Sequence, residues 1–170
     1  MRRFALTTFG LMAACALSTT ASAAPKARSD AAQIRALEDR FAAAVRAKDV
    51  DAIMRVYSPA DGLTVFDVVP PRAYVGMAAY RQDWQTVVGG TSGPINFMIS
   101  DLKIEASGDM AYSHSIQTMA WTGGKGDAHS FAVRVTDVYR KRDGAWRIVH
   151  EHVSVPVDLA TGQGDLASAP

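Results

Sequence analysis

The sequence predicts an α+β domain in which a cone-shaped, curved antiparallel sheet packs against three N-terminal helices. Apolar residues recur at helical spacing through residues 34–57 and 76–87, whereas from residue 95 to 155 they alternate in four long segments joined by short turns. Helices followed by a run of strands are typical of α+β domains with an antiparallel sheet. A bent sheet with helices on one side leaves a concavity, which is a preferred site for small ligands.

The N-terminal residues are typical of a secretory signal peptide. Arg2 and Arg3 precede an apolar run from Phe4 to Leu17, and Ala21-Ser22-Ala23 supplies the small residues required before a cleavage site. We therefore divide the chain into a signal peptide (1–23), a linker (24–29), one domain (30–156) and a flexible tail (157–170). This layout predicts a periplasmic or secreted protein with no membrane contact after cleavage.

Composition excludes several functional classes. The chain carries 18 basic and 17 acidic residues, a formal charge of +1, and such a balance argues against a nucleic-acid partner. No Walker loop, dinucleotide-binding glycine pattern or cysteine-rich metal spacing is present, so we expect no cofactor and no metal. Cleavage after Ala23 also removes Cys15, the only cysteine. Lipidation of Cys15 is the alternative, although Met12 fits that signal poorly.

The helical half divides into three segments. The first, from Asp30, places Ile34, Leu37, Phe41 and Val45 on an apolar face. Its other side carries Arg35, Glu38, Asp39, Arg46 and Lys48. Asp49 can cap a second, short helix that carries Ile53, Met54 and Tyr57 and that ends before Pro59. A third helix begins near Gly76, carries Met77, Tyr80, Trp84 and Val87 on one stripe, and ends at Gly89-Gly90.

The strand half follows a short strand at Leu63–Asp67. The long strands are expected over 95–106, 110–122, 128–140 and 145–155. In the first of them the apolar parity changes between Ile99 and Leu102, which indicates a bulge that bends the sheet.

The last two strands pair as a hairpin through Asp143-Gly144. One predicted face carries Phe131, Val133, Val135, Asp137, Val149, Glu151, Val153 and Val155. The other carries Arg134, Thr136, Trp146, Ile148, His150, His152 and Ser154. Since both faces are partly apolar, we expect helices to cover one and a second copy of the chain to cover the other, giving a homodimer through the outer sheet face.

Several residues are candidates for chemistry. Asp67 ends an apolar strand, where a carboxylate can have a raised pKa and act as a base, or can simply cap the following loop. Asp137 and Glu151 are either partners of basic residues or paired acids in a pocket. His150 and His152 stand two residues apart on a strand, so they point to the same face, and together with His114 they could form a three-histidine metal site. No carboxylate spacing supports such a site.

The chain from about Ile34 to Pro156 resembles the nuclear transport factor 2-like superfamily. The residues that carry the resemblance are Lys48–Ala52, Leu63–Phe66, Val75–Met77, Ala111-Tyr112 and, above all, the final hairpin Arg142–Ser154. Within the superfamily the chain is most similar to the SnoaL-like group and to the association domain of calcium/calmodulin-dependent protein kinase II. This resemblance implies the curved-sheet fold, which hosts isomerases, dehydratases, cyclases and non-catalytic assembly modules.

The resemblance also implies site residues. The pocket positions of the kinase association domain match Tyr80, His114, Asp137 and Val153, which suggests that His114 and Asp137 form a histidine–carboxylate pair. Comparison with ketosteroid isomerase places Asp67 at the position of the catalytic base. The oxyanion-binding positions of that enzyme match Phe41 and Val133, which cannot donate a hydrogen bond, so steroid isomerisation is not expected.

These expectations combine into a functional hypothesis. The domain would bind a small, largely apolar organic molecule held by Tyr57, Tyr80, Trp84 and Asp137, and would act as an isomerase, cyclase or dehydratase with Asp67 and His114 as the proton-transfer groups. The alternative is a non-catalytic module for ligand binding or homo-oligomerisation.

Overall fold

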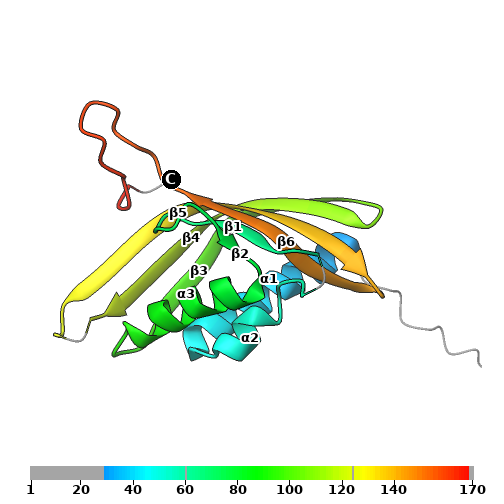
Figure 1. Ribbon diagram of the computed structural model, residues 1–170, viewed down its shortest axis with the longest axis horizontal. Helices are drawn as coiled ribbons and strands as arrows, with labels where there is room; N and C mark the ends of the chain where they lie inside the picture. Colours follow the sequence, from blue (N-terminus) through cyan, green and yellow to red (C-terminus); the bar gives the residue numbers. More distant parts are fainter. Residues whose placement is uncertain (1–28, 60, 124, 169–170) are drawn as a thin grey trace, which may run out of the picture.

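The computed structural model describes residues 29–168 except residues 60 and 124 (Figure 1). The predicted signal peptide and all of the linker but Ser29 lie outside the described residues, as do the last two residues of the tail. Within the described part, no helix is both long enough and apolar enough to cross a membrane.

The predicted fold class is confirmed: helices precede a curved, unclosed six-stranded sheet (Figure 1). The helices are α1 (Asp30–Ala47), α2 (Val50–Met54) and α3 (Met77–Gly89). The strands are β1 (Thr64–Phe66), β2 (Tyr74–Val75), β3 (Asn96–Ser107), β4 (Met110–Thr122), β5 (Ala128–Arg142) and β6 (Ala145–Ser154). Their order in the sheet is β2-β1-β6-β5-β4-β3, with β1 parallel to β6 and the other pairs antiparallel.

Side-chain caps fix where the first two helices begin. The hydroxyl of Ser29 accepts a hydrogen bond from the N–H of Ala32 (3.3 Å), so Ser29 is the N-cap and α1 begins at Asp30. Asp49 caps α2 as expected, because its Oδ1 accepts from the N–H of Ala52 (2.8 Å). Satisfying these otherwise unpaired N–H groups stabilises the helix ends by about 1 kcal/mol each.

Two irregularities curve the sheet. The register of β3 against β4 shifts between Ser100 and Lys103, which confirms the bulge predicted from the parity change. A second shift, between Val138 and Tyr139 on β5, turns both Trp146 and Glu151 of β6 inward. The prediction that Trp146 and Ile148 lie on the opposite face from Glu151 is therefore wrong, because a bulge restarts the alternation of side chains along a strand.

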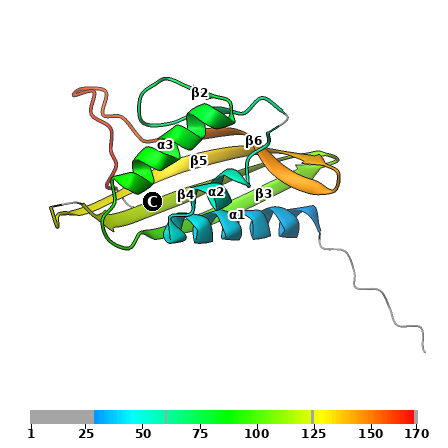
Figure 2. The same ribbon diagram turned by 60° about the horizontal axis from the view of Figure 1, so that its bottom comes forward.

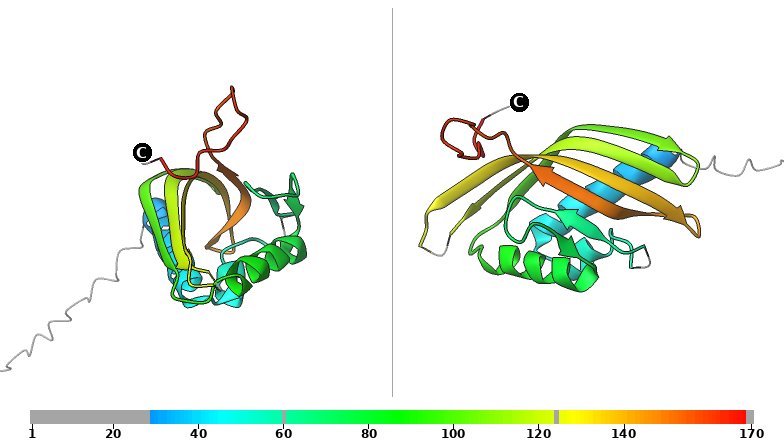
Figure 3. Two further views of the ribbon diagram at one scale, coloured as in Figure 1. Left: turned by 90° about the vertical axis from the view of Figure 1, so that its left-hand side faces the viewer. Right: turned by 45° about the horizontal axis from the view of Figure 1, so that its top comes forward.

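The helices all lie on the concave side of the sheet, which curls around them (Figures 2 and 3). The inner faces of the strands pack with Ile34, Leu37, Phe41 and Val45 of α1 to form the core. Glu38 is an exception to the prediction for α1: it was expected on the solvent side, but it is only 2% exposed. Glu38 lies next to Leu37 at the edge of the apolar face, where it is buried, whereas Arg35 and Asp39 remain exposed.

The segment after β6, expected to form a flexible tail, makes a loop that closes on itself and then returns to β5 at Leu166 (Figure 1). Val157 and Gly164 form an isolated bridge, and the N–H of Ala132 donates to the carbonyl oxygen of Leu166 (2.9 Å). Leu166 thus occupies the edge of β5 that becomes free where β6 ends.

Candidate functional site

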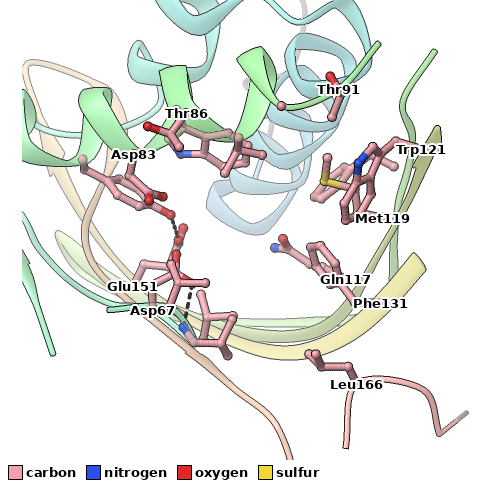
Figure 4. Close-up of a pocket in the computed structure, with 18 of the residues that line it drawn as sticks. Asp67, Asp83, Thr86, Thr91, Gln117, Met119, Trp121, Phe131, Glu151 and Leu166 are labelled. Atoms are coloured by element: carbon pink, nitrogen blue, oxygen red, sulfur yellow. Dashed lines mark hydrogen bonds between the residues drawn. The ribbon is translucent and has the colours of Figure 1, made fainter. Parts of the chain in front are cut away.

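A cavity of about 420 Å³ lies between α3 and the inner faces of β3 to β6 (Figure 4). The residues that line it come from α1, the loop after β1, α3, the strands and the C-terminal segment. They are Phe41, Asp67, Val68, Val69, Tyr80, Asp83, Trp84, Thr86, Val87, Gly90, Thr91, Phe97, Gln117, Met119, Trp121, Phe131, Glu151, Val153 and Leu166. A cavity of this size suits a small organic molecule.

Helical and strand periodicity bring these side chains together. On α3, Tyr80, Asp83, Trp84 and Val87 follow one another at intervals of three, one and three residues, so they share a face. On β4, Gln117, Met119 and Trp121 alternate onto the concave side. The register shift between β5 and β6, which leaves Val149 of β6 as the extra residue, gives Glu151 the same inward direction.

Asp67 stands at the end of β1, where the chain turns into the loop that lines the cavity. Its Oδ1 accepts a hydrogen bond from the N–H of Val68 (2.6 Å; Figure 4). Burial raises the pKa of the Asp67 carboxyl above its usual value of 3.8, the backbone of Val68 and Val69 opposes this rise, and the charge of Asp83 adds to it. The same carboxylate therefore caps the loop and faces the cavity.

Glu151 is the most deeply buried acid of the cavity, at 4% exposure. Its Oε1 accepts a hydrogen bond from the hydroxyl of Tyr80 (2.5 Å), and its Oε2 accepts one from Tyr57 (2.9 Å). Burial raises the pKa of Glu151 to about 7, although both tyrosine hydrogen bonds favour the ionised form. A carboxyl group with this pKa can both accept and donate a proton near neutral pH.

Behind Glu151, two further acids are enclosed in the core. Asp137 lies directly opposite Glu151 in the β5–β6 pairing. Tyr139 donates a hydrogen bond to Oε1 of Glu38 (2.8 Å) and also shares one with the hydroxyl of Ser113 (2.8 Å).

Burial and mutual repulsion set the charges of these inner acids. Burial raises the pKa of Glu38 to about 7. Burial and the charges of Glu38 and Glu151 raise the pKa of Asp137 well above its usual range. The three acids therefore hold protons at pH values where exposed carboxyls have lost them.

The remaining cavity surface is aromatic and apolar, with few polar groups. The carboxyl of Asp83 accepts a hydrogen bond from the hydroxyl of Tyr74 (2.8 Å). The amide of Gln117 points into the cavity from the opposite wall (Figure 4). The buried indole N–H of Trp84 has no hydrogen-bond partner within the described part of the chain. These groups could bind polar atoms of a ligand.

Three of the predicted site residues line the cavity: Asp67, Tyr80 and Trp84. Tyr57 and Asp137 do not; they lie deeper and contact or face Glu151.

The predicted pairing of His114 with Asp137 is wrong. His114 is exposed and pairs with Thr136 on the outer face, whereas Asp137 is opposite Ser113 and points inward. Neighbouring residues on a strand point to opposite faces, so a match displaced by one residue reverses the assignment.

The three-histidine alternative is also not formed. The ring of His150 hydrogen-bonds to the carbonyl oxygen of Thr64 (2.8 Å), and both His150 and His152 pack edge-on against Phe66. Across the described residues, no three His, Cys, Asp or Glu side chains are grouped so that they could hold a metal ion.

From the sequence, Glu151 could be either the partner of a basic residue or one of two paired acids in a pocket. Asp83 and Glu38 were not predicted as site residues. Asp83 could have been found, because it lies three residues after Tyr80 on the predicted stripe. Glu38 also had a signal, since it follows Ile34 by four residues and Leu37 by one. A carboxyl at such a position reads as a solvated residue unless the enclosing sheet is known.

Comparisons with known proteins agree with this architecture. The SnoaL-like domain family matches residues 34–158. An NTF2-like protein of unknown function from Pseudomonas putida is 31% identical, with a TM-score of 0.73 over 84% of this chain and 99% of that one.

Two more distant structures show the same fold. A provisionally assigned calcium/calmodulin-dependent protein kinase II association domain from Xanthomonas campestris is 24% identical, with a TM-score of 0.64 over 82% of this chain and 96% of the other. A ketosteroid isomerase-like protein from Erwinia carotovora atroseptica is 21% identical, with a TM-score of 0.61 over 72% and 93%. A comparison with curated proteins finds no significant match.

Proposed function

This chain belongs to the SnoaL-like domain family of the NTF2-like superfamily, and we propose that it binds a small, largely apolar organic molecule and transfers protons on it, as an isomerase, cyclase or dehydratase does. One observation carries the proposal. Two carboxyl groups with raised pKa values, those of Asp67 and Glu151, share one end of a cavity whose other walls are mainly apolar. Acid–base chemistry in enzymes uses such groups.

The two carboxyls differ in their surroundings, which supports different roles. Asp67 is half-buried and held by the backbone, so its ionised form can act as the base that removes a proton from the ligand. Glu151 with its Tyr80 partner can supply a proton, because its pKa of about 7 leaves it partly protonated at neutral pH. In this scheme Glu151 takes the part that the sequence assigned to His114.

Ligand binding is tested with N-phenyl-1-naphthylamine, a neutral apolar dye that fluoresces strongly when it leaves water. Val87→Trp should fill the cavity and weaken dye binding at least about tenfold, since apolar burial of the ring contributes a few kcal/mol. Gln85→Trp, on the exposed side of the same helix, is the matched control and should bind as the wild type does. Equal binding by both variants would place the dye outside the cavity and overturn this part of the proposal.

Proton transfer is tested with 5-nitrobenzisoxazole. A base removes the proton from its C3 carbon, the electron pair of that bond forms the nitrile, and the N–O bond breaks to leave a coloured phenolate. We expect the wild type to be roughly 100-fold faster than Asp67→Asn. The rate should also rise with pH through a midpoint above the 3.8 of an ordinary aspartate, because only the ionised form is a base. His114→Asn is the control on the outer face. An unchanged rate in Asp67→Asn would refute the role of Asp67.

We also propose that the chain is exported and that it forms a homodimer through the outer sheet face. The residues that support the dimer are apolar and exposed on that face: Phe66 (42%), Met98 (56%) and Tyr112 (48%). Light scattering after size-exclusion chromatography should give twice the chain mass for the wild type and the monomer mass for Tyr112→Lys. A monomeric wild type at micromolar concentration would contradict the dimer.

A further inference from the structure

We propose that the ligand of the cavity is a hydrophobic amine, whose ammonium group is held between the carboxyls of Asp67 and Asp83 while its skeleton occupies the aromatic walls. This inference rests on the proposed function, because it names the chemical class of the molecule that the same cavity binds. The proposed function describes the ligand only as small and largely apolar, and the inference adds that it carries a positive charge.

The charged groups that face the cavity are all acidic. Asp67, Asp83 and Glu151 line it, and no Lys, Arg or His does so among the described residues. Each described ion pair uses other acids, such as Asp30 with Lys141 and Asp51 with Arg81. No described basic side chain therefore compensates the acids at this end of the cavity, and their ionised forms attract a cation and repel an anion.

The three carboxyls also interact with one another, since the charge of Asp83 acts on Asp67 and that of Asp67 acts on Glu151. Figure 4 shows Asp67, Asp83 and Glu151 on one side of the cavity, facing Gln117 and Met119. Asp83 and Glu151 each accept a tyrosine hydroxyl, from Tyr74 and Tyr80 respectively, so their positions are fixed before a ligand arrives. An ammonium group has three N–H donors and can bind two carboxylates at once.

The walls suit the rest of such a molecule. Trp84 is almost completely buried on α3, and Trp121 and Phe131 pack edge-on at the other side of the cavity. Aromatic faces bind apolar skeletons and are also attracted to an adjacent cation. An aliphatic lining would offer only the first of these interactions.

Without a ligand, protons compensate part of this negative charge. A bound ammonium would take the place of those protons, which then pass to solvent, and it would favour ionised Asp67. The ligand's own charge would thus convert Asp67 into the form that acts as a base. A neutral ligand of the same shape has no such effect, so the two can be told apart by affinity.

The test uses three probes with one naphthalene skeleton: 1-naphthylmethylamine, which is a cation at neutral pH, the neutral 1-naphthylmethanol, and the anion 1-naphthoate. Isothermal titration of the full chain should give an amine that binds at least about tenfold more tightly than the alcohol, and a naphthoate that binds more weakly than both. Asp67→Asn and Asp83→Asn should each reduce the amine's advantage several-fold. Asp101→Asn, at an exposed position outside the cavity, should leave it unchanged.

The outcomes separate this inference from the proposed function. Equal affinity for amine and alcohol, with both lost in Val87→Trp, would overturn the amine inference and leave the apolar cavity standing. A preference for amine that persists in both aspartate variants would also overturn it, because the charge would then be recognised elsewhere. Failure of all three probes and of N-phenyl-1-naphthylamine to bind would overturn the inference and the ligand-binding function together.

Discussion

Replacing Glu38 by glutamine should make the protein's stability less dependent on pH. In the native state burial raises the pKa of Glu38 from its usual 4.5 to about 7, so the folded protein keeps a proton that the unfolded chain releases. A raised carboxyl pKa means that folding is favoured at low pH and loses stability as pH rises from 4.5 through about 7. For Glu38 alone this loss is about 2 to 3 kcal/mol between pH 5 and pH 8.

Glutamine keeps the shape of the side chain and can still accept the hydrogen bond from Tyr139, but it cannot ionise. We therefore expect the difference in unfolding free energy between pH 5 and pH 8 to shrink by about 2 to 3 kcal/mol in Glu38→Gln. Asp137 and Glu151 retain their own contributions of the same sign, so some dependence on pH remains.

Urea unfolding followed by tryptophan fluorescence at the two pH values measures this difference directly. Glu105→Gln changes an exposed glutamate and serves as the matched control, with a pH dependence like that of the wild type. If Glu38→Gln has the same pH dependence as Glu105→Gln, then Glu38 is ionised in the native state and the account of the buried acids is wrong.

Three further predictions concern the cavity. Tyr80→Phe removes a hydrogen-bond donor to ionised Glu151, so the pKa of Glu151 should rise by about one pH unit above its present value near 7. A carbon-13 NMR titration measures this change, and an unchanged pKa would show that the 2.5 Å hydrogen bond from Tyr80 contributes little. Leu166→Ser removes half-exposed apolar surface at the edge of the cavity and should weaken binding of N-phenyl-1-naphthylamine about fivefold, whereas full affinity would mean that the C-terminal segment takes no part in the site. His114→Ala should alter neither dye binding nor turnover of 5-nitrobenzisoxazole, because His114 lies on the outer face. A loss of either would show that His114 contributes to the site.

Much of the fold follows from local patterns in the sequence. The parity change between Ile99 and Leu102 revealed the bulge of β3, because both halves of that strand have a clear apolar alternation. The apolar residues of α3 recur at helical spacing, which predicts that Tyr80 and Trp84 lie on its inner face, and both line the cavity. Asp67, which also lines the cavity, was a candidate because it ends an apolar strand and because the resemblance to ketosteroid isomerase places it at the position of the base.

Two of the errors, the face assigned to Trp146 and the exposure assigned to Glu38, arise from the curvature of the sheet. The register shift beside Val138 could not be found from the sequence. Apolar residues of β6 occur at both odd and even positions, such as Val149 and Trp146, so the alternation does not show where the shift lies. The spacing of Glu38 from Ile34 places it beside the apolar face of α1, but its charge favoured the solvent side because the strands that bury it are distant in sequence. Both facts depend on contacts between residues distant in sequence, and these decide which buried acids face Glu151.

Asp67 and Glu151 both line the cavity, and the pKa values of both carboxyl groups are raised. Carbon-13 NMR of the side-chain carboxyls tests it directly, with Asp67→Asn and Glu151→Gln used to assign the two signals. We expect the Glu151 signal to titrate at about pH 7, the Asp67 signal to titrate above 3.8, and both signals to move when 1-naphthylmethylamine is added. Signals that titrate like those of exposed acids and that do not respond to the amine would contradict it.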